Sequence, residues 1–274
     1  MNRKRMMVVV RNDLKQLVQA KDYWIPMIAL GALFFFVLPA VLLFTIQKLG
    51  AVGSVQQIAN TLKVLPKAAQ AQIRGTTPEA RTSYALAVFL FAPIAVIVPL
   101  TISTAVGAAA IVGERERGTG EFLAHSPATT REIYIGKLLA SFIPGYATTM
   151  VGFAVYTLVV NTIAGPSIGG WFFPTAQWWI LMFWVVPPFL LLTLSVVLRL
   201  SARVHSTAAA QQAAGLVSLP MIMVAYAETS GALFGASVSP WVVGSLSWLV
   251  ATLSLLRGMR SVTRSRLLGV ANAI

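Results

Sequence analysis

The chain has 274 residues, of which 57% are hydrophobic and 11% are charged, and its mean hydropathy is +0.77. Because an ordinary soluble domain carries about 25% charged residues, this composition excludes a water-soluble domain and indicates apolar surface that faces lipid. The net charge of +13 could indicate nucleic-acid binding, but the basic residues flank apolar stretches, which favours an anionic membrane surface. The absence of cysteine excludes disulfides, thiolate metal sites and a cysteine nucleophile.

The N-terminal segment, residues 3–22, predicts an amphipathic helix at the membrane interface. Apolar residues recur on one stripe at helical spacing, and basic residues lie off that stripe. The stripe contains Val10, Leu14, Leu17 and Val18. The basic residues are Arg11, Lys15 and Lys21. Together with Asp13 and Asp22, these charges exclude the uninterrupted apolar core of a cleavable signal peptide.

Charge-free stretches predict the membrane spans. A helix needs about 20 apolar residues to cross a bilayer, and the segment AGPSIGG (164–170) predicts a turn that divides the long stretch 138–198. We expect six spans, at about 24–46, 84–112, 134–162, 177–198, 207–227 and 241–256. The sixth is short before Arg257, and a re-entrant segment before it could extend it. The fold class is therefore an all-α integral membrane protein, with residues 1–274 forming a single domain.

The basic residues also predict the orientation. Six spans place both termini on one side, together with sixteen of the 21 Lys and Arg residues. The other side has five, namely Lys48, Lys63, Lys67, Arg74 and Arg81. Because cytoplasmic loops carry an excess of Lys and Arg, we expect a multi-pass protein of the plasma (cytoplasmic) membrane, with both termini in the cytoplasm.

The opposite, outer side has three features of its own. Apolar residues at helical spacing between 55 and 65 predict a small external helix. Thr77, Pro78 and Glu79 resemble a helix start, with a capping threonine, proline at the first helical position and an acid in the first turn. Three tryptophans fit an aromatic belt at this interface. They are Trp171, Trp178 and Trp179.

No pattern in the chain fits an enzyme. The two histidines, His125 and His205, fall in predicted cytoplasmic loops and have no metal-binding spacing. The chain contains neither a G-x-S-x-G elbow nor a phosphate-binding P-loop. We therefore expect a transport subunit that has no cofactor of its own.

The spans lack the ionisable groups that gradient-driven carriers usually need inside the membrane. Glu228, at the outer end of the fifth span, comes closest. It is either an ordinary interfacial residue or a polar gate near an outward exit. A pathway without a coupling group of its own indicates that energy enters through a partner protein.

The densest run of mixed charge lies between the second and third spans. Residues 82–113 as one helix would be roughly 48 Å long at about 1.5 Å per residue, which exceeds a hydrocarbon core of about 30 Å. The helix would therefore reach into the cytosol before a sharp turn at 118–120. A short apolar segment (121–124) and a proline turn follow. Thr129 and Glu132 match a capping box that starts the third span.

Two stretches resemble the type-2 ABC exporter permeases. GERERGTGEFLAHSPATTREIYIGKLLA (113–140) is similar to the cytoplasmic loop of that family, which repeats acid and base before Gly-Thr and continues through an apolar segment and a proline turn. SARVHSTAAAQQAAGLVSLP (201–220) is similar to the family's entry into the fifth span. The six spans and the N-terminal amphipathic helix agree with this resemblance.

The resemblance implies a permease dimer, homo- or heteromeric, in which each half binds a separate ATP-binding subunit that holds ATP and magnesium. It implies that the loop 113–133 carries a coupling helix that docks to this subunit. Phe122 and Leu123 would fill the docking groove, and the charged residues would orient the contact. The coupling residues would be Gly113, Glu114, Arg115, Glu116, Arg117, Gly118, Thr119, Glu121, Phe122 and Leu123. Two alternatives stay open: a gradient-driven carrier or channel without an ATPase partner, and a non-transporting membrane subunit.

Overall fold

The structure, a computed structural model, describes residues 2–49, 70–119, 125–204, 206–229 and 240–261. Every regular element within these ranges is helical. The elements are α1 (Arg3–Gln19), α2 (Lys21–Ala32), η1 (Leu33–Val37), α3 (Leu38–Leu49), α6 (Pro78–Ala85), η2 (Leu86–Leu90), α7 (Ile94–Glu116), α9 (Thr130–Ile163), α10 (Gly165–Ile168), α11 (Ala176–Ile180), η3 (Leu181–Val185), α12 (Val186–Ser201), α13 (Thr207–Thr229) and α14 (Pro240–Ser261).

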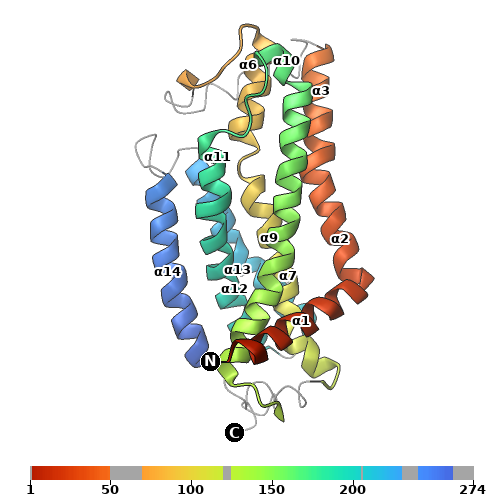
Figure 1. Cartoon of the computed structure of the whole chain (residues 1–274), viewed down its shortest axis with the longest axis vertical. Helices are drawn as coiled ribbons and strands as arrows, with labels where there is room; N and C mark the ends of the chain where they lie inside the picture. The colour runs from red at the N-terminus through yellow and green to blue at the C-terminus, as the bar shows by residue number, and fades with distance from the viewer. Residues whose placement is uncertain (1, 50–69, 120–124, 205, 230–239, 262–274) are drawn as a thin grey trace.

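Six helical runs of the described chain are long and apolar enough to cross a membrane, which confirms the predicted all-α membrane fold. They are Lys21–Lys48, Pro78–Glu114, Thr130–Ile163, Ala176–Ser201, Thr207–Val224 and Pro240–Arg260. These runs follow the long axis of the molecule, and α1 lies across one end, beside the N-terminus (Figure 1). We call this end the foot. The short helices α6 and α10 lie at the opposite end.

Helix α9 is central to the packing. It contacts α1, α3, α7 and α12, while α7 also packs against α12 and α13, and α14 packs against α12. The close approach of α7 and α9 requires Gly145, where a Cβ would lie 2.1 Å from Ser103 Oγ and 2.9 Å from the Pro99 carbonyl oxygen. The two spans that flank the predicted coupling loop therefore form one tightly packed pair.

The second span is broken, although the sequence analysis treated residues 82–113 as one helix. The α-helix changes to the π-segment η2, ends in a turn at 91–93, and resumes as α7. The Phe91 N–H donates to the Leu86 carbonyl at 3.0 Å, five residues back. Pro93 explains the turn because it has no N–H and disfavours helical geometry in the residue before it.

Aromatic side chains satisfy the carbonyl groups at this break. The Tyr156 hydroxyl donates to the Ala87 carbonyl at 2.8 Å, and the Trp178 indole N–H donates to the Val88 carbonyl at 2.9 Å. Both rings belong to a buried cluster that includes Phe153 and Phe173. Trp178 is 2% exposed, so its predicted place in an aromatic belt is wrong. Trp171 and Trp179 are exposed, as such a belt requires.

The sixth span is longer than predicted. Helix α14 continues through Arg257 and Arg260 to Ser261, so it reaches spanning length without help from the segment before it. Both arginines are exposed, and long basic side chains at a helix end can extend to the polar interface. The proposed re-entrant segment, 230–239, lies outside the described residues, as does the predicted external helix between 55 and 65.

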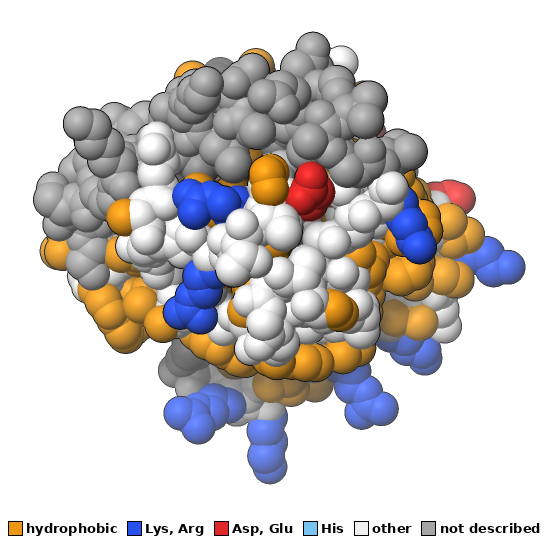
Figure 2. All heavy atoms as spheres, turned by 90° about the horizontal axis from the view of Figure 1, so that it is seen from above, with side chains coloured by type: hydrophobic (Ala, Val, Ile, Leu, Met, Phe, Trp, Pro, Cys, Tyr) orange, Lys and Arg blue, Asp and Glu red, His pale blue; other side chains and the backbone are white. Residues whose placement is uncertain are grey.

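The predicted start of α6 is confirmed. The Thr77 side chain accepts the Ala80 N–H at 3.2 Å, and Pro78 occupies the first turn. Figure 2 looks onto this end of the molecule. Backbone atoms and side chains that are neither hydrophobic nor charged cover much of the described end face, and hydrophobic side chains surround its lower edge in this view. This distribution fits a bundle whose flanks face lipid.

Candidate functional site at the foot of helix α7

Helix α7 ends in a tight turn at the predicted position. Gly118 has φ +70°, a left-handed conformation that glycine adopts without penalty. The Thr119 N–H donates to the Glu114 carbonyl at 2.8 Å, the long-range bond of a Schellman motif. The Thr119 hydroxyl donates to the same carbonyl at 3.1 Å. Three predicted coupling residues, Glu114, Gly118 and Thr119, therefore form the end of the helix itself.

Glu114 lies inside the protein, in an ion cluster that joins three helices. Lys137 of α9 donates to Glu114 Oε1 at 2.8 Å and to Asp13 Oδ2 of α1 at 3.2 Å. Only 1% of the Lys137 side chain and 8% of the Glu114 side chain are exposed. Removing one partner from a buried ion pair leaves an uncompensated charge, which costs several kcal/mol. The cluster therefore holds α1, α7 and α9 together.

Glu116 points to the opposite side of α7. Successive helical residues turn by about 100°, so residues 114 and 116 project in nearly opposite directions. Glu116 Oε1 accepts the Thr207 N–H at 2.8 Å, and Glu116 Oε2 accepts the Thr207 hydroxyl. Thr207 is the first residue of α13, where the unpaired N–H groups and the helix dipole favour a negative charge. Glu116 therefore joins the end of the second span to the start of the fifth.

Helix α12 also contacts the foot of α7. The Ser201 hydroxyl donates to the Ala108 carbonyl at 2.6 Å and accepts the Val112 N–H at 3.3 Å. Ser201 is 1% exposed, so these bonds are shielded from water. Through Glu114, Glu116 and Ser201 the last three turns of α7 bond to α9, α13 and α12, and through Lys137 to α1.

Further bonds tie α1 to the start of α9. Thr129 and Glu132 form the predicted capping box, which confirms the predicted helix start. The Glu132 carboxylate also accepts the backbone N–H of Asn2. Arg5 Nη1 donates to the Pro127 carbonyl at 2.8 Å. The N-terminal helix is thus held against both the loop and the span that follow α7.

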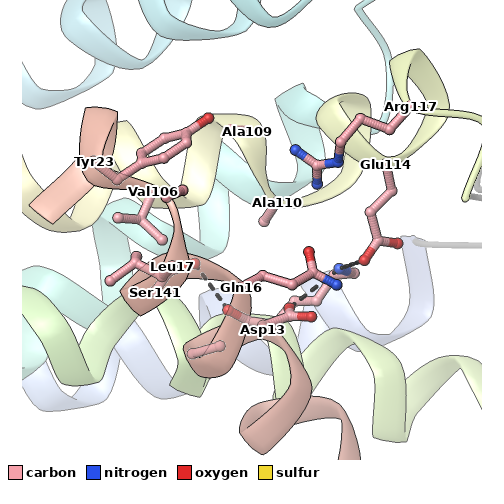
Figure 3. A pocket seen from close by; sticks show the side chains of 13 residues that line it. Asp13, Gln16, Leu17, Tyr23, Val106, Ala109, Ala110, Glu114, Arg117 and Ser141 are labelled. Carbon is pink, nitrogen blue, oxygen red and sulfur yellow. Dashed lines mark hydrogen bonds and ion pairs between the residues drawn. The ribbon is translucent and has the colours of Figure 1, made fainter.

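A pocket of about 90 Å³ lies between α1, α7 and α9 beside the ion cluster (Figure 3). Asp13, Glu114 and Lys137 form part of its wall, and Arg117 extends over it from the end of α7. The side chain of Arg117 is exposed and has no hydrogen-bond or ion-pair partner among the described residues. Glu114 Oε2 is buried and has no hydrogen-bond partner there either.

The remaining predicted site residues are placed as follows. Gly113 and Arg115 belong to the last turns of α7, although the Arg115 side chain is not among the described ones. Glu121, Phe122 and Leu123 lie outside the described residues. Glu228 is in α13, but its side chain is not described, so its role as an outer gate stays a prediction.

Sequence reasoning missed the roles of Asp13, Lys137 and Thr207. Lys137 was counted among the basic residues of the cytoplasmic side and belongs to the stretch 113–140 that carries the family resemblance, but it was given no partner. A usable signal was present, since Lys137 stands seven residues after the start of α9, deep enough in a long apolar helix to need an acidic partner. The spacing of the charges could not reveal which acids would supply it.

Six membrane-length helices among the described residues define a multi-pass membrane protein. The sequence model of the family described as "ABC-2 family transporter protein" matches residues 7–264. The chain therefore belongs to the ABC-2 transporter family, whose members are transmembrane permeases. No curated protein matches the chain. The resemblance inferred from residues 113–140 and 201–220 is confirmed.

Proposed function

We propose that the chain is the permease subunit of an ATP-driven exporter. It forms the translocation path with a second permease, identical or different, in the plasma membrane, with both termini in the cytoplasm. A separate ATP-binding subunit docks on the 113–133 loop and supplies the energy. Support comes from the family membership, from the excess of basic residues on the predicted cytoplasmic side, and from the architecture of the foot.

The observation that carries this proposal is that one helix end bonds to three other helices and is linked through Lys137 to a fourth. The end of α7 precedes the predicted docking segment, and its neighbours on both sides are fixed to it by charged or buried bonds. A displacement of the loop would therefore move α7 together with α1, α9, α12 and α13. A solvated linker would need none of these connections.

Within this proposal the two acids act inside the permease, and the segment 121–123 makes the contact with the ATPase. Glu114 keeps α7 and α9 together as one unit. Glu116 passes the displacement to α13. This assignment refines the expectation that both acids orient the docking contact directly.

The exposed face of α13 supports the proposal that a second permease or an aqueous path lies against this helix. Gln211 and Gln212 are exposed within a membrane-length helix. Amide side chains are unfavourable against hydrocarbon, because lipid tails offer no hydrogen-bond partner. A second permease or an aqueous path would supply one.

The test uses Glu116→Gln in the complete transporter, reconstituted in liposomes with its ATPase. The amide retains an acceptor for the Thr207 N–H but loses the charge at the start of α13. We expect normal assembly and ATP binding with ATP-driven flux reduced about tenfold, equivalent to about 1.4 kcal/mol of lost coupling. The matched control is Asp22→Asn, an exposed acid in the first turn of α2.

Equal flux in Glu116→Gln and wild type would contradict the role of Glu116 in coupling. Flux that persists in liposomes without any ATPase would contradict the proposed function itself and favour a gradient-driven carrier. Glu114 is unsuitable for this test, because its removal would leave Lys137 buried with one partner fewer. A loss of flux could then result from lost stability instead of lost coupling.

A further inference from the structure

The pocket between α1, α7 and α9 contains hydrogen-bond donors that no described residue uses. The Arg117 guanidinium, the Tyr23 hydroxyl and the Gln16 amide line it, and none of the three side chains has a partner among the described residues. Lys137, in contrast, already binds Asp13 and Glu114. The polar groups left over therefore include the five N–H groups of an arginine, beside one buried acceptor, Glu114 Oε2.

These donors converge on one space. In Figure 3 the guanidinium of Arg117 and the phenol of Tyr23 stand on opposite sides of the pocket, with their polar ends toward its middle. Leu17, Ala20 and Val106 supply an apolar part of the wall. At about 10–15 Å³ of such volume for one water molecule, a pocket of about 90 Å³ has room for a group of several atoms.

The position of the pocket along the bundle indicates a membrane interface. Tyr23 is the third residue of the first span, and Glu114 is the last residue of the second. Tyrosine prefers the depth of the lipid headgroups, where its ring is in an apolar layer and its hydroxyl is hydrated. Helix α1 crosses the foot at the same end and exposes Met7, Val8 and Val18, as an interfacial helix does.

We propose that this pocket is a specific binding site for the phosphodiester headgroup of a membrane phospholipid. Arg117 binds the phosphate with its planar fork, a geometry that suits phosphate oxygens. Tyr23 and Gln16 donate to the remaining oxygens. The acyl chains leave along the apolar wall toward the flank of the bundle. A free anion would use the same donors, but it would gain nothing from that apolar wall.

The site joins lipid binding to the foot of α7. Arg117 follows the last residue of α7, while Gln16 belongs to α1 and Tyr23 to α2. A bound headgroup therefore bridges the interfacial helix and the end of the second span, next to the ion cluster that already connects them. Lipid occupancy does not require ATP coupling, so the two proposals can fail separately.

The test counts phospholipids that remain bound to the full-length chain after purification in mild detergent, by native mass spectrometry. Delipidated protein receives limiting phosphatidylglycerol, phosphatidylethanolamine or diacylglycerol, and parallel samples receive inorganic phosphate. We expect about one phospholipid of either class per chain and no retention of diacylglycerol, which lacks the phosphate. Arg117→Gln should lower the apparent lipid affinity about tenfold, as for the loss of one charge-assisted hydrogen bond.

Two further variants complete the design. Tyr23→Phe removes one hydroxyl and should weaken lipid binding without affecting folding. Arg131→Gln removes an exposed arginine from the start of α9, outside the pocket lining, and should leave retention unchanged. Equal lipid retention by Arg117→Gln and wild type would overturn the proposal, as would retention of diacylglycerol. Displacement of the lipid by inorganic phosphate at equal concentration would indicate a soluble-anion site and would overturn the lipid assignment.

Discussion

Lys137 carries a charge that the fold requires, although its role could not be recognised from the sequence. Its ammonium group is almost fully buried and is neutralised by acids from two other helices. Attraction across such a cluster offsets the cost of burying the charges only while every partner is present. Replacing any one of the three residues of this cluster should therefore destabilise the protein.

At the residue scale, Lys137→Met should destabilise the protein by about 3 kcal/mol, because it leaves two carboxylates facing each other without a cation. The unfolding temperature in detergent, monitored as the loss of monodisperse protein on heating, measures this effect. Arg131→Met, on the exposed side of the same helix, is the control and should unfold at the wild-type temperature. Equal unfolding temperatures for Lys137→Met and wild type would show that the cluster does not hold the foot together.

The limits of sequence reasoning are visible in the two acids at the end of α7. Charge and glycine patterns were enough to predict that both acids lie where the second span leaves the membrane and that a turn follows at Gly118. Their targets could not be predicted, because Lys137 and Thr207 lie 23 and 91 residues farther along the chain. Only the packing of α9 and α13 around α7 brings these partners together.

At the element scale, the break in the second span depends on aromatic donors from the third and fourth spans. Tyr156→Phe removes the hydroxyl that satisfies the Ala87 carbonyl while it keeps the shape of the ring. A buried carbonyl without a donor costs about 1–3 kcal/mol. We expect a lower unfolding temperature for Tyr156→Phe and little change for Trp179→Phe, whose ring is half exposed. An unchanged temperature for Tyr156→Phe would mean that the break does not need this hydrogen bond.

The packing of α7 against α9 makes a second prediction at this scale. Gly145→Ala would place a methyl group against Ser103 and the Pro99 carbonyl, so the helices must separate, at about 1–3 kcal/mol. Gly215→Ala is the matched control, since nothing lies within 4 Å of the added Cβ. In a helix interior that exchange is neutral or stabilising by up to about 1 kcal/mol. If both variants were equally stable, the close approach would not be required.

The ends of the helices could be predicted well where the sequence changes from apolar to charged residues or contains a capping residue or a glycine. The six spans, the Thr77 and Thr129 caps and the turn after α7 all have local signals in charge, capping residues or glycine. The π-segments and the burial of Trp178 have none, because they arise from contacts between spans. Pro93 was a local sign that the second span would not be continuous, but Pro99, six residues on, lies inside α7, so proline alone did not locate the break.

At the scale of the whole molecule, the described chain leaves large apolar areas uncovered. Less than a third of the best apolar window is buried in each of the first, fifth and sixth spans, in contrast to 72% in the second. The second span therefore lies at the centre of the described chain, and the other three lie at its flanks. This arrangement places the foot of α7 where a movement of the loop reaches most of the bundle.

The most direct test of the central claim is purification of this chain from its native membrane in mild detergent, after cross-linking at residues 113–124, with mass spectrometry of the bound proteins. The proposed function predicts an ATP-binding subunit with a P-loop in a stoichiometric amount, cross-linked to this loop, together with a second permease. Recovery of the chain alone, with no ATPase attached to the loop, would contradict the proposed function.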